Sequence, residues 1–198
     1  MNSVIYLKAL NDPSITPCLA LVDLQQEYIA DNRLMAMPNI SVALDKCRAA
    51  LHHARSMGFP IAFFRQISKS SFFNPATTYS SWISGFEPTR DDMIFDRDQP
   101  SCYANKSFSD LMESCGGNFI IAGFAGETAC LSTAIDAFHR NHRFTFLSDA
   151  SASHQLGALP ARDVHGAVNE IIKVYGTVTD TDSWIGSTSD LLITETIR

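Results

Sequence analysis

Asp23 is the residue of this chain best suited to acid or base chemistry. It closes the apolar run from residue 18 to residue 22, which is typical of a buried parallel strand. Burial among apolar neighbours raises the pKa of a carboxyl group unless a cation lies near, and a raised pKa suits a general acid or base. An Asp that only caps the next helix is the alternative. The position directly after a strand favours catalysis, because ligands of open parallel sheets bind beyond the carboxyl ends of the strands.

The elements that must position Asp23 alternate between strands and helices. Short apolar runs are followed by stretches with helical spacing of apolar residues, and Gly and Pro mark several of the boundaries. This alternation predicts an α/β, three-layer doubly wound fold with a mostly parallel central sheet of about six strands and helices on both faces. The expected strands are 18–23, 61–64, 93–95, 119–123 and 144–147, and the expected helices are 40–54, 104–114, 131–138 and 160–173.

A long connection separates the second and third expected strands. The stretch from Gln66 to Arg90 is aromatic and rich in Ser and Thr, and it is too long for a plain connection in a compact domain. Such a loop usually covers a site. Its Phe72, Phe73 and Trp82, together with Tyr28, are either an aromatic lining over a flat substrate or ordinary core residues.

The composition argues against several other classes of protein. A chain of 198 residues without internal repeats predicts a single domain over 1–198. The net charge of −6 and the scattered Lys and Arg residues argue against nucleic-acid binding. The chain has neither an apolar stretch of membrane-spanning length nor a signal-peptide pattern, so we expect no membrane partner and a cytoplasmic location. Five cysteines without a C-x-x-C pair indicate free thiols rather than disulfides or a zinc site.

Four short motifs resemble those of one known family. They are Ala20-Leu21-Val22-Asp23-Leu24-Gln25, Ile120-Ile121-Ala122-Gly123-Phe124-Ala125, Thr133-Ala134-Ile135-Asp136-Ala137-Phe138 and Ser148-Asp149-Ala150. In order and spacing they are similar to the isochorismatase-like hydrolase superfamily, which includes nicotinamidase-type cysteine hydrolases, over roughly Cys18 to Trp184. The resemblance implies a cofactor-independent hydrolase that acts on a small, anionic metabolite and assembles as a homodimer or homotetramer. Some nicotinamidases bind a metal through an Asp-x-His pattern after the second strand, but residues 65–69 lack it, so we expect no metal.

The resemblance also implies a cation near Asp23. The family carries a Lys after the third strand, followed three residues on by a segment of the form x-Ser-Ala-Phe, which Pro100-Ser101-Cys102-Tyr103 fits. This spacing places Arg97 at the Lys position. Arg stays charged and its planar fork holds a carboxylate, so Arg97 would orient Asp23 or bind an anionic substrate. A surface Arg paired with a neighbouring Asp is the alternative.

The turn from Gly123 to Cys130 departs from the pattern of the cysteine hydrolases. Those enzymes place a Cys nucleophile at the start of the next helix, where backbone amides stabilise both thiolate and oxyanion. Here the alignment puts Ala129 at that position and Cys130 one residue later. One residue of helix rotates a side chain by about 100°, so Cys130 would point away from Asp23 unless the turn is irregular. The residues expected to hold substrate or an oxyanion are Phe124, Ala125, Ala129 and Tyr103.

Three functions therefore remain open. In the isochorismatase branch a small residue stands at the nucleophile position, and an Asp protonates a vinyl ether to which water then adds. Ala129 favours this route, with Asp23 as the acid. The alternative is a cysteine amidase with an Asp23/Arg97/Cys130 triad, in which Asp23 deprotonates the thiol. The third is a non-catalytic binding protein on the same fold.

His154 is typical of a loop residue, with a place at the pocket rim as the alternative.

Overall fold

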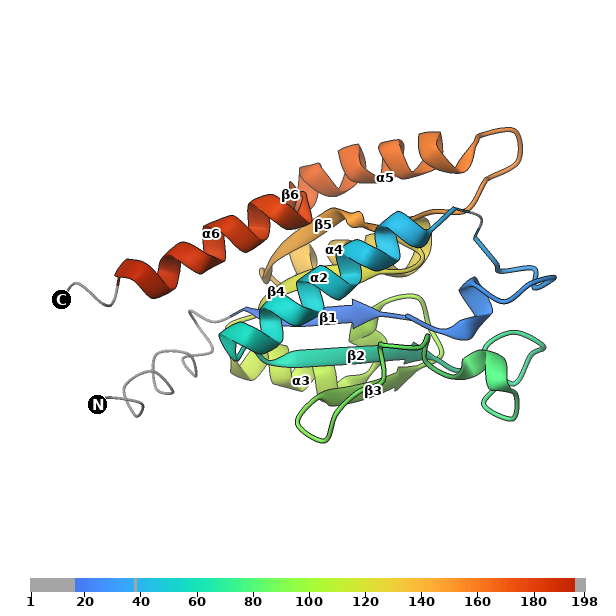
Figure 1. The fold of residues 1–198 in the computed structure, drawn as a ribbon, viewed down its shortest axis with the longest axis horizontal. Coiled ribbons are helices and arrows are strands. Elements are labelled where there is room, and N and C mark those ends of the chain that lie inside the picture. Colours follow the sequence, from blue (N-terminus) through green and yellow to red (C-terminus); the bar gives the residue numbers. More distant parts are fainter. Residues whose placement is uncertain (1–16, 38, 195–198) are drawn as a thin grey trace.

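A six-stranded sheet organises the chain. The computed structural model describes residues 17–37 and 39–194, and Figure 1 shows how their elements are arranged. All strand pairs are parallel, in the order β3-β2-β1-β4-β5-β6. This topology confirms the predicted α/β doubly wound fold. The strands are β1 (Cys18–Val22), β2 (Ile61–Gln66), β3 (Met93–Arg97), β4 (Asn118–Gly123), β5 (Arg143–Ser151) and β6 (Thr177–Thr179).

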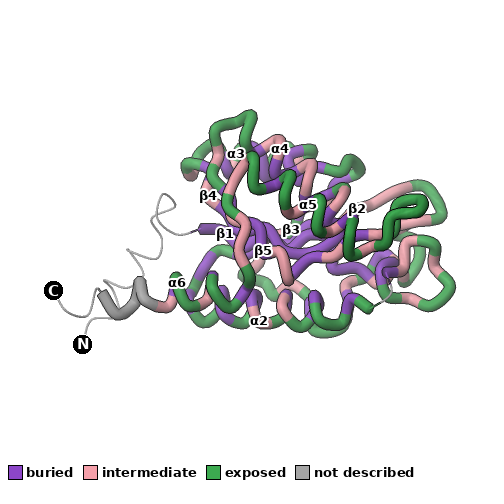
Figure 2. The backbone as a smooth tube through the Cα atoms, turned by 90° about the horizontal axis from the view of Figure 1, so that it is seen from above, coloured by how far each residue is buried: buried purple, intermediate pink, exposed green. Residues whose placement is uncertain are grey.

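Helices cover both faces of the sheet and complete the three layers. Figure 2 shows the buried strands between two groups of helices whose outer surfaces are exposed. One face carries α2 (Ser41–Met57) and α6 (Thr181–Thr194), and the other carries α3 (Lys106–Ser114), α4 (Leu131–His139) and α5 (Ala161–Tyr175).

Strand β1 shows why the central strands are apolar throughout. Successive residues of a strand point to opposite faces. Accordingly, Leu19 and Leu21 pack into the core under α2, whereas Ala20 and Val22 pack into the core under α3, α4 and α5. All five residues of β1 are buried, because both faces of the sheet are covered.

The strand order places the end of β1 at the switch point of the sheet. From β1 the chain proceeds to β2 and β3 on one side and then crosses to β4 on the other, and ligands of such sheets bind at this reversal. Val22 and Gly123 are paired in register, and the Phe124 amide donates to the Val22 carbonyl at 2.8 Å. Gly123 has φ 118°, and a Cβ there would lie 2.1 Å from the Val22 carbonyl oxygen, so only glycine fits this approach.

Several elements differ from the sequence-based expectations. Strand β3 continues to Arg97, which makes the expected cation the last residue of the strand. The three-residue strand β6 was not predicted by the apolar spacing, because it is half-exposed and too short to show a period. The expected helix 104–114 begins at Lys106, after a 3-10 turn at Cys102–Ala104. Before α4, residues Gly126–Cys130 form the π-helical turn η4.

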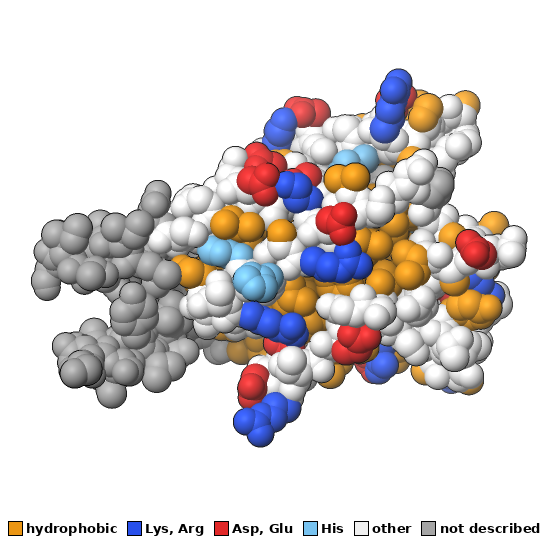
Figure 3. Space-filling model, viewed as in Figure 1, with side chains coloured by type: hydrophobic (Ala, Val, Ile, Leu, Met, Phe, Trp, Pro, Cys, Tyr) orange, Lys and Arg blue, Asp and Glu red, His pale blue; other side chains and the backbone are white. Residues whose placement is uncertain are grey.

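The face that carries α2 has an interspersed distribution of charge. Figure 3 shows basic and acidic side chains next to one another around an apolar centre. They include the ion pairs Arg48–Asp45 at 2.6 Å and Lys46–Asp182 at 2.8 Å. This face therefore presents no continuous basic surface of the kind that binds nucleic acid. Within residues 17–37 and 39–194, no helix has both the length and the apolar character needed to cross a membrane.

Candidate active site

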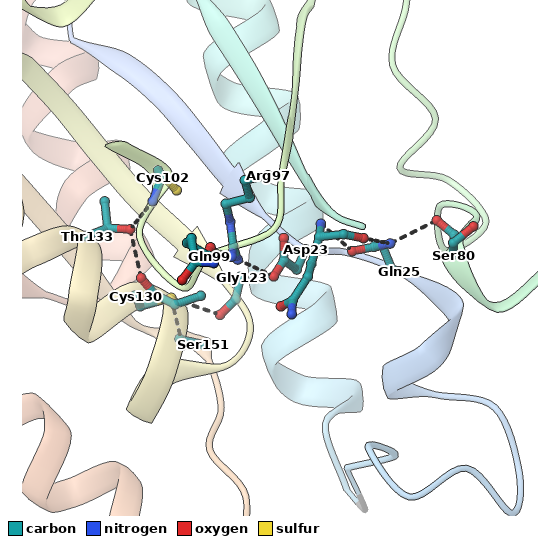
Figure 4. A network of polar contacts seen from close by, with 12 residues as sticks. Asp23, Gln25, Ser80, Arg97, Gln99, Cys102, Gly123, Cys130, Thr133 and Ser151 are labelled. Atoms are coloured by element: carbon teal, nitrogen blue, oxygen red, sulfur yellow. Dashed lines mark hydrogen bonds and ion pairs between the residues drawn. The ribbon is translucent and has the colours of Figure 1, made fainter. Parts of the chain in front are cut away.

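Asp23 and Arg97 form a fully buried ion pair at the carboxyl edge of the sheet. Asp23 follows β1 directly and adopts φ 50°, and Arg97 reaches it from the end of β3, two strands away. Arg97 Nη2 donates to Asp23 Oδ2, and Arg97 Nη1 donates to the Gln99 carbonyl (Figure 4). Both side chains are inaccessible to solvent. A charge buried this far is tolerated because its partner compensates it.

The surroundings of Asp23 prepare it for proton transfer near neutral pH. Burial raises the pKa of Asp23 to about 6, although the guanidinium of Arg97 opposes the shift. One carboxylate oxygen, Oδ2, is held by Arg97, while the buried Oδ1 has no hydrogen-bond partner in the described part of the chain. A carboxyl group with one fixed and one free oxygen can give a proton to, or take one from, a bound molecule.

Arg97 is buried and divides its guanidinium between two acceptors of the protein. Its two terminal nitrogens are engaged by Asp23 and by the Gln99 carbonyl, and among its nitrogens only the buried Nε lacks a partner within the described residues. This geometry fits an Arg that orients Asp23 better than one that holds a substrate carboxylate.

The thiol of Cys130 makes its contacts with residues other than the ion pair. Its Sγ lies 3.6 Å from the Gly123 carbonyl oxygen and 3.9 Å from Ser151 Oγ, and in Figure 4 Gly123 lies between Cys130 and Asp23. The side chain is fully buried in the core under α4, and burial raises the pKa of the thiol well above its ordinary value. The irregularity that a shifted nucleophile would require is present as η4, yet it does not bring the sulfur into a hydrogen bond with Asp23 or Arg97.

The turn before α4 is tightly bonded to its surroundings. The peptide bond between Phe124 and Ala125 is cis, and both residues are buried. The amides of Thr128 and Cys130 donate to the Ala125 carbonyl, and the amide of Gly126 donates to the carbonyl of residue 152. These three amides are therefore already engaged and cannot also hold a reacting oxygen. Ala129 is buried as well, and its carbonyl accepts a hydrogen bond from Thr133 Oγ1 at 2.7 Å.

Tyr103 lies apart from the other expected site residues. Its hydroxyl is 2.7 Å from Nδ1 of His142, which directly precedes β5, and its ring contacts Phe119 near the start of β4. The hydroxyl therefore points toward the amino ends of β4 and β5, whereas Asp23 lies at the carboxyl ends. The x-Ser-Ala-Phe resemblance placed the backbone of this segment but did not predict the direction of the Tyr103 side chain.

Gln25 is a site residue to which the sequence analysis gave no role. Its Nε2 donates to the carbonyls of Gln66 and Ser80 at 3.0 and 2.9 Å, and its Oε1 accepts from the Gln66 amide at 2.9 Å (Figure 4). Gln25 is fully buried. It thus ties the segment that carries Asp23 to the end of β2 and to the loop 66–90. Its place in the Asp-x-Gln motif was the signal that pointed to it.

Tyr28 and Phe73 belong to the hydrophobic core, and Phe72 and Trp82 pack against it, which agrees with the expectation of ordinary core residues. Tyr28 is buried and packs its ring on Phe73 and Phe124, with centroid distances of 5.3 and 5.8 Å. Trp82 instead packs on Phe63 of β2 at 5.5 Å. The loop 66–90 also borders a hollow of about 420 Å³ at the ends of β2 and β3, lined by Gln66, Ile67, Ser68, Lys69, Pro75 and Asp98.

A doubly wound α/β sheet with a polar pair at its switch point defines a class of proteins that bind small molecules beyond the strand ends. Comparison of the sequence with family models identifies the family. The isochorismatase domain matches residues 17–183, so the chain belongs to the isochorismatase family and is a hydrolase of that family. Among curated proteins, no relative is found.

Solved structures share this fold. An isochorismatase from Pseudomonas putida is 23% identical, with a TM-score of 0.79 over 85% of this chain and 89% of that chain. A cysteine hydrolase from Pseudomonas syringae is 20% identical, with a TM-score of 0.77 over 89% and 93% of the two chains. An N-carbamoylsarcosine amidase from Thermoplasma acidophilum is 18% identical, with a TM-score of 0.68 over 84% and 97%. At these identities the likeness establishes the fold alone.

Proposed function

We propose that the chain hydrolyses a small metabolite with Asp23 as general acid and without a covalent intermediate. The observation that carries this proposal is a contrast. Oδ1 of Asp23 has no partner among the described residues, whereas the thiol of Cys130 contacts Gly123 and Ser151 and makes no hydrogen bond to Asp23 or Arg97 there. In a vinyl ether, the Asp23 carboxyl group would protonate the alkene carbon, and water would add to the resulting cation. The adduct would then release an alcohol and a keto acid, and the proton lost by the added water would restore the carboxyl group.

Arg97 has an orienting role in this proposal. It holds Oδ2 of Asp23 and lowers the pKa that burial raises, so that Asp23 can both give and regain its proton near neutral pH. With a pKa of about 6, roughly one molecule in ten is protonated at pH 7. The expectation of an anionic substrate depended on a free Arg97 fork, and the engaged terminal nitrogens give it little support. The proposal also includes a single domain over 1–198 and assembly as a homodimer or homotetramer, by resemblance to the family.

The pH dependence separates acid from base catalysis. If Asp23 acts as the acid, its protonated form is the active one, and kcat/KM should fall as pH rises above about 6. If Asp23 instead deprotonates a thiol, kcat/KM should rise through the same pH. The measurement is kcat/KM from pH 4.5 to 8.5 on isochorismate, as a vinyl ether, and on nicotinamide, as a primary amide. A rate that increases with pH through about 6 would remove the acid mechanism.

A cysteine amidase is the second candidate, because η4 supplies an irregularity directly before Cys130. The acid mechanism predicts that Cys130→Ala keeps kcat/KM within about threefold of wild type, with a loss of about 1 kcal/mol in unfolding free energy from the lost packing. The measurement is turnover on the same two compounds together with urea denaturation. A loss of activity of a hundredfold or more in a folded Cys130→Ala would favour the amidase.

Labelling of the thiols gives an independent check. Cys115 is partly exposed, whereas Cys130 is fully buried. Iodoacetamide should therefore modify Cys115 of the native protein while Cys130 stays unmodified, as peptide mass spectrometry would detect. Cys115→Ala is the matched control variant, since it removes a thiol far from Asp23. Loss of activity that follows modification of Cys130 in Cys115→Ala would contradict the acid mechanism.

A further inference from the structure

A second ion pair, with a buried carboxylate and a partly exposed imidazole, lies beside the candidate active site. Glu127, in η4, accepts a hydrogen bond from His154 Nδ1 at 2.7 Å, and its side chain is 7% exposed. Neither the motifs nor the proposed mechanism assigns a role to Glu127. His154 follows β5, so the pair joins the two segments that flank Cys130 and Ser151.

The contacts of His154 define its charge. Its Nδ1 faces the Glu127 carboxylate, and its Nε2 lies 3.0 Å from the Met35 carbonyl. Both partners are acceptors, so both ring nitrogens must donate and the imidazole must be protonated. The hydrogen bond to Glu127 correspondingly raises the pKa of His154. Burial opposes ionisation of Glu127, but the contacts with His154 outweigh it, so the pKa of Glu127 lies below its ordinary value. Glu127 is therefore a carboxylate.

The other oxygen of Glu127 is unused. Glu127 Oε2 is buried and has no hydrogen-bond partner among the described residues, which for a carboxylate oxygen is costly. The charge of Glu127 reaches both Tyr28 and Cys130, where it raises the pKa of each, and Tyr28 also experiences the charge of Asp23. Tyr28 is therefore near enough to both Glu127 and Asp23 to experience the charge of each. The ring of Tyr28 packs against those of Phe124 and His154 in tilted arrangements, with centroid distances of 5.8 and 5.9 Å, which places the ion pair next to the Phe124 turn.

We propose that Glu127 Oε2 accepts a hydrogen bond from an N–H or O–H group of the substrate, and that His154 positions Glu127 for this contact. The inference rests on the proposed function and specifies its substrate class: a small molecule with an amide, amine or hydroxyl donor next to the reacting bond. His154 neutralises Glu127, so the donor need not be cationic. A substrate carboxylate at this place would meet a fixed carboxylate and be rejected. In this arrangement Glu127 is the charged hydrogen-bond acceptor for the substrate, and Asp23 is the proton donor.

Binding of benzamide and benzoate tests the proposal. The two ligands share a phenyl ring, but benzamide carries an N–H donor where benzoate carries a carboxylate. Wild type should bind benzamide at least tenfold more tightly, with saturable binding by calorimetry below about 10 mM ligand. Glu127→Gln presents an amide hydrogen to the ligand while it can still accept from His154. The affinity of this variant for benzamide should be about tenfold lower than that of wild type, and its affinity for benzoate about tenfold higher. Glu170→Gln, on the outer surface of α5, is the matched control and should leave both affinities unchanged.

A purely structural role for the pair would lower the melting temperature of Glu127→Gln without changing the ligand preference. That result would overturn the proposal. So would equal binding of the two ligands to wild type, or the absence of saturable binding of benzamide. Repeating the binding in Asp23→Asn distinguishes this inference from the proposed function. If Asp23→Asn loses turnover but Glu127→Gln still prefers benzamide over benzoate as wild type does, the acid mechanism stands and the proposed role of Glu127 is wrong. If Asp23→Asn stays active while Glu127→Gln prefers benzoate, the role of Glu127 stands and the acid mechanism is wrong.

Discussion

Asp23→Asn is expected to lower kcat/KM by roughly 10²- to 10⁴-fold, the range that a positioned general acid or base contributes. Asn has nearly the shape of Asp and its amide oxygen can still accept from Arg97, but it carries no proton that it can transfer. The effect should appear mainly in kcat, because the substituted atom acts in the chemical step. The measurement is steady-state kinetics on isochorismate and nicotinamide, with circular dichroism to verify that the variant is folded.

Asp96→Asn is the control for this experiment. Asp96, in β3, likewise binds an arginine, because Arg65 contacts it through two hydrogen bonds of 2.8 Å, but the side chain of Asp96 is 38% exposed. The substitution removes a carboxylate from a comparable pair outside the site, so kcat/KM should stay within about twofold of wild type. An Asp23→Asn enzyme that retains more than about a tenth of the wild-type activity would exclude Asp23 as either acid or base.

Arg97→Met is expected to lower the unfolding free energy by about 3–5 kcal/mol at pH 8, because it leaves Asp23 buried without its cation. Without the guanidinium, the pKa of Asp23 in the folded state rises further above that of the unfolded chain. A raised carboxyl pKa stabilises the fold at low pH, and this contribution is lost as pH increases. The deficit of Arg97→Met should therefore be largest at pH 8 and smallest near pH 4, as urea denaturation at several pH values would reveal.

Two further variants sharpen this test. Arg65→Met removes the partner of Asp96 near the surface and should cost no more than about 1 kcal/mol with little pH dependence. Arg97→Lys keeps the charge but loses the planar guanidinium, which donates to two acceptors. Its loss of unfolding free energy should therefore lie between those of Arg97→Met and Arg65→Met. A pH-independent deficit in Arg97→Met would mean that lost packing, rather than an uncompensated Asp23, dominates.

The sequence predicted the fold well because its main signals are local. The run of five apolar residues before Asp23 needs both faces covered, and this alone argues for a parallel sheet with helices on each side. Strand β6 could not be predicted in this way, because its three residues are at least partly exposed and form no run of buried apolar side chains. The contact between Asp23 and Arg97 was expected from the resemblance, and the structure brings the two side chains together.

Side-chain directions across long sequence separations could not be predicted in the same way. Whether Tyr103 turns toward β5 depends on His142, which is 39 residues away, and the partner of Glu127 lies 27 residues further along the chain. The direction of the Cys130 sulfur depends on a π-helical turn that leaves no mark in the apolar spacing. Such details follow from the packing of distant segments, which a motif does not encode.

The contacts of Gln25 bear on how the family can diversify. Each of its hydrogen bonds to the second strand and the long loop ends on a main-chain atom, of Gln66 or of Ser80. The attachment is thus indifferent to which side chains the loop carries. Substitutions of the loop side chains would therefore leave these hydrogen bonds, and with them the anchoring of the loop beside Asp23, in place.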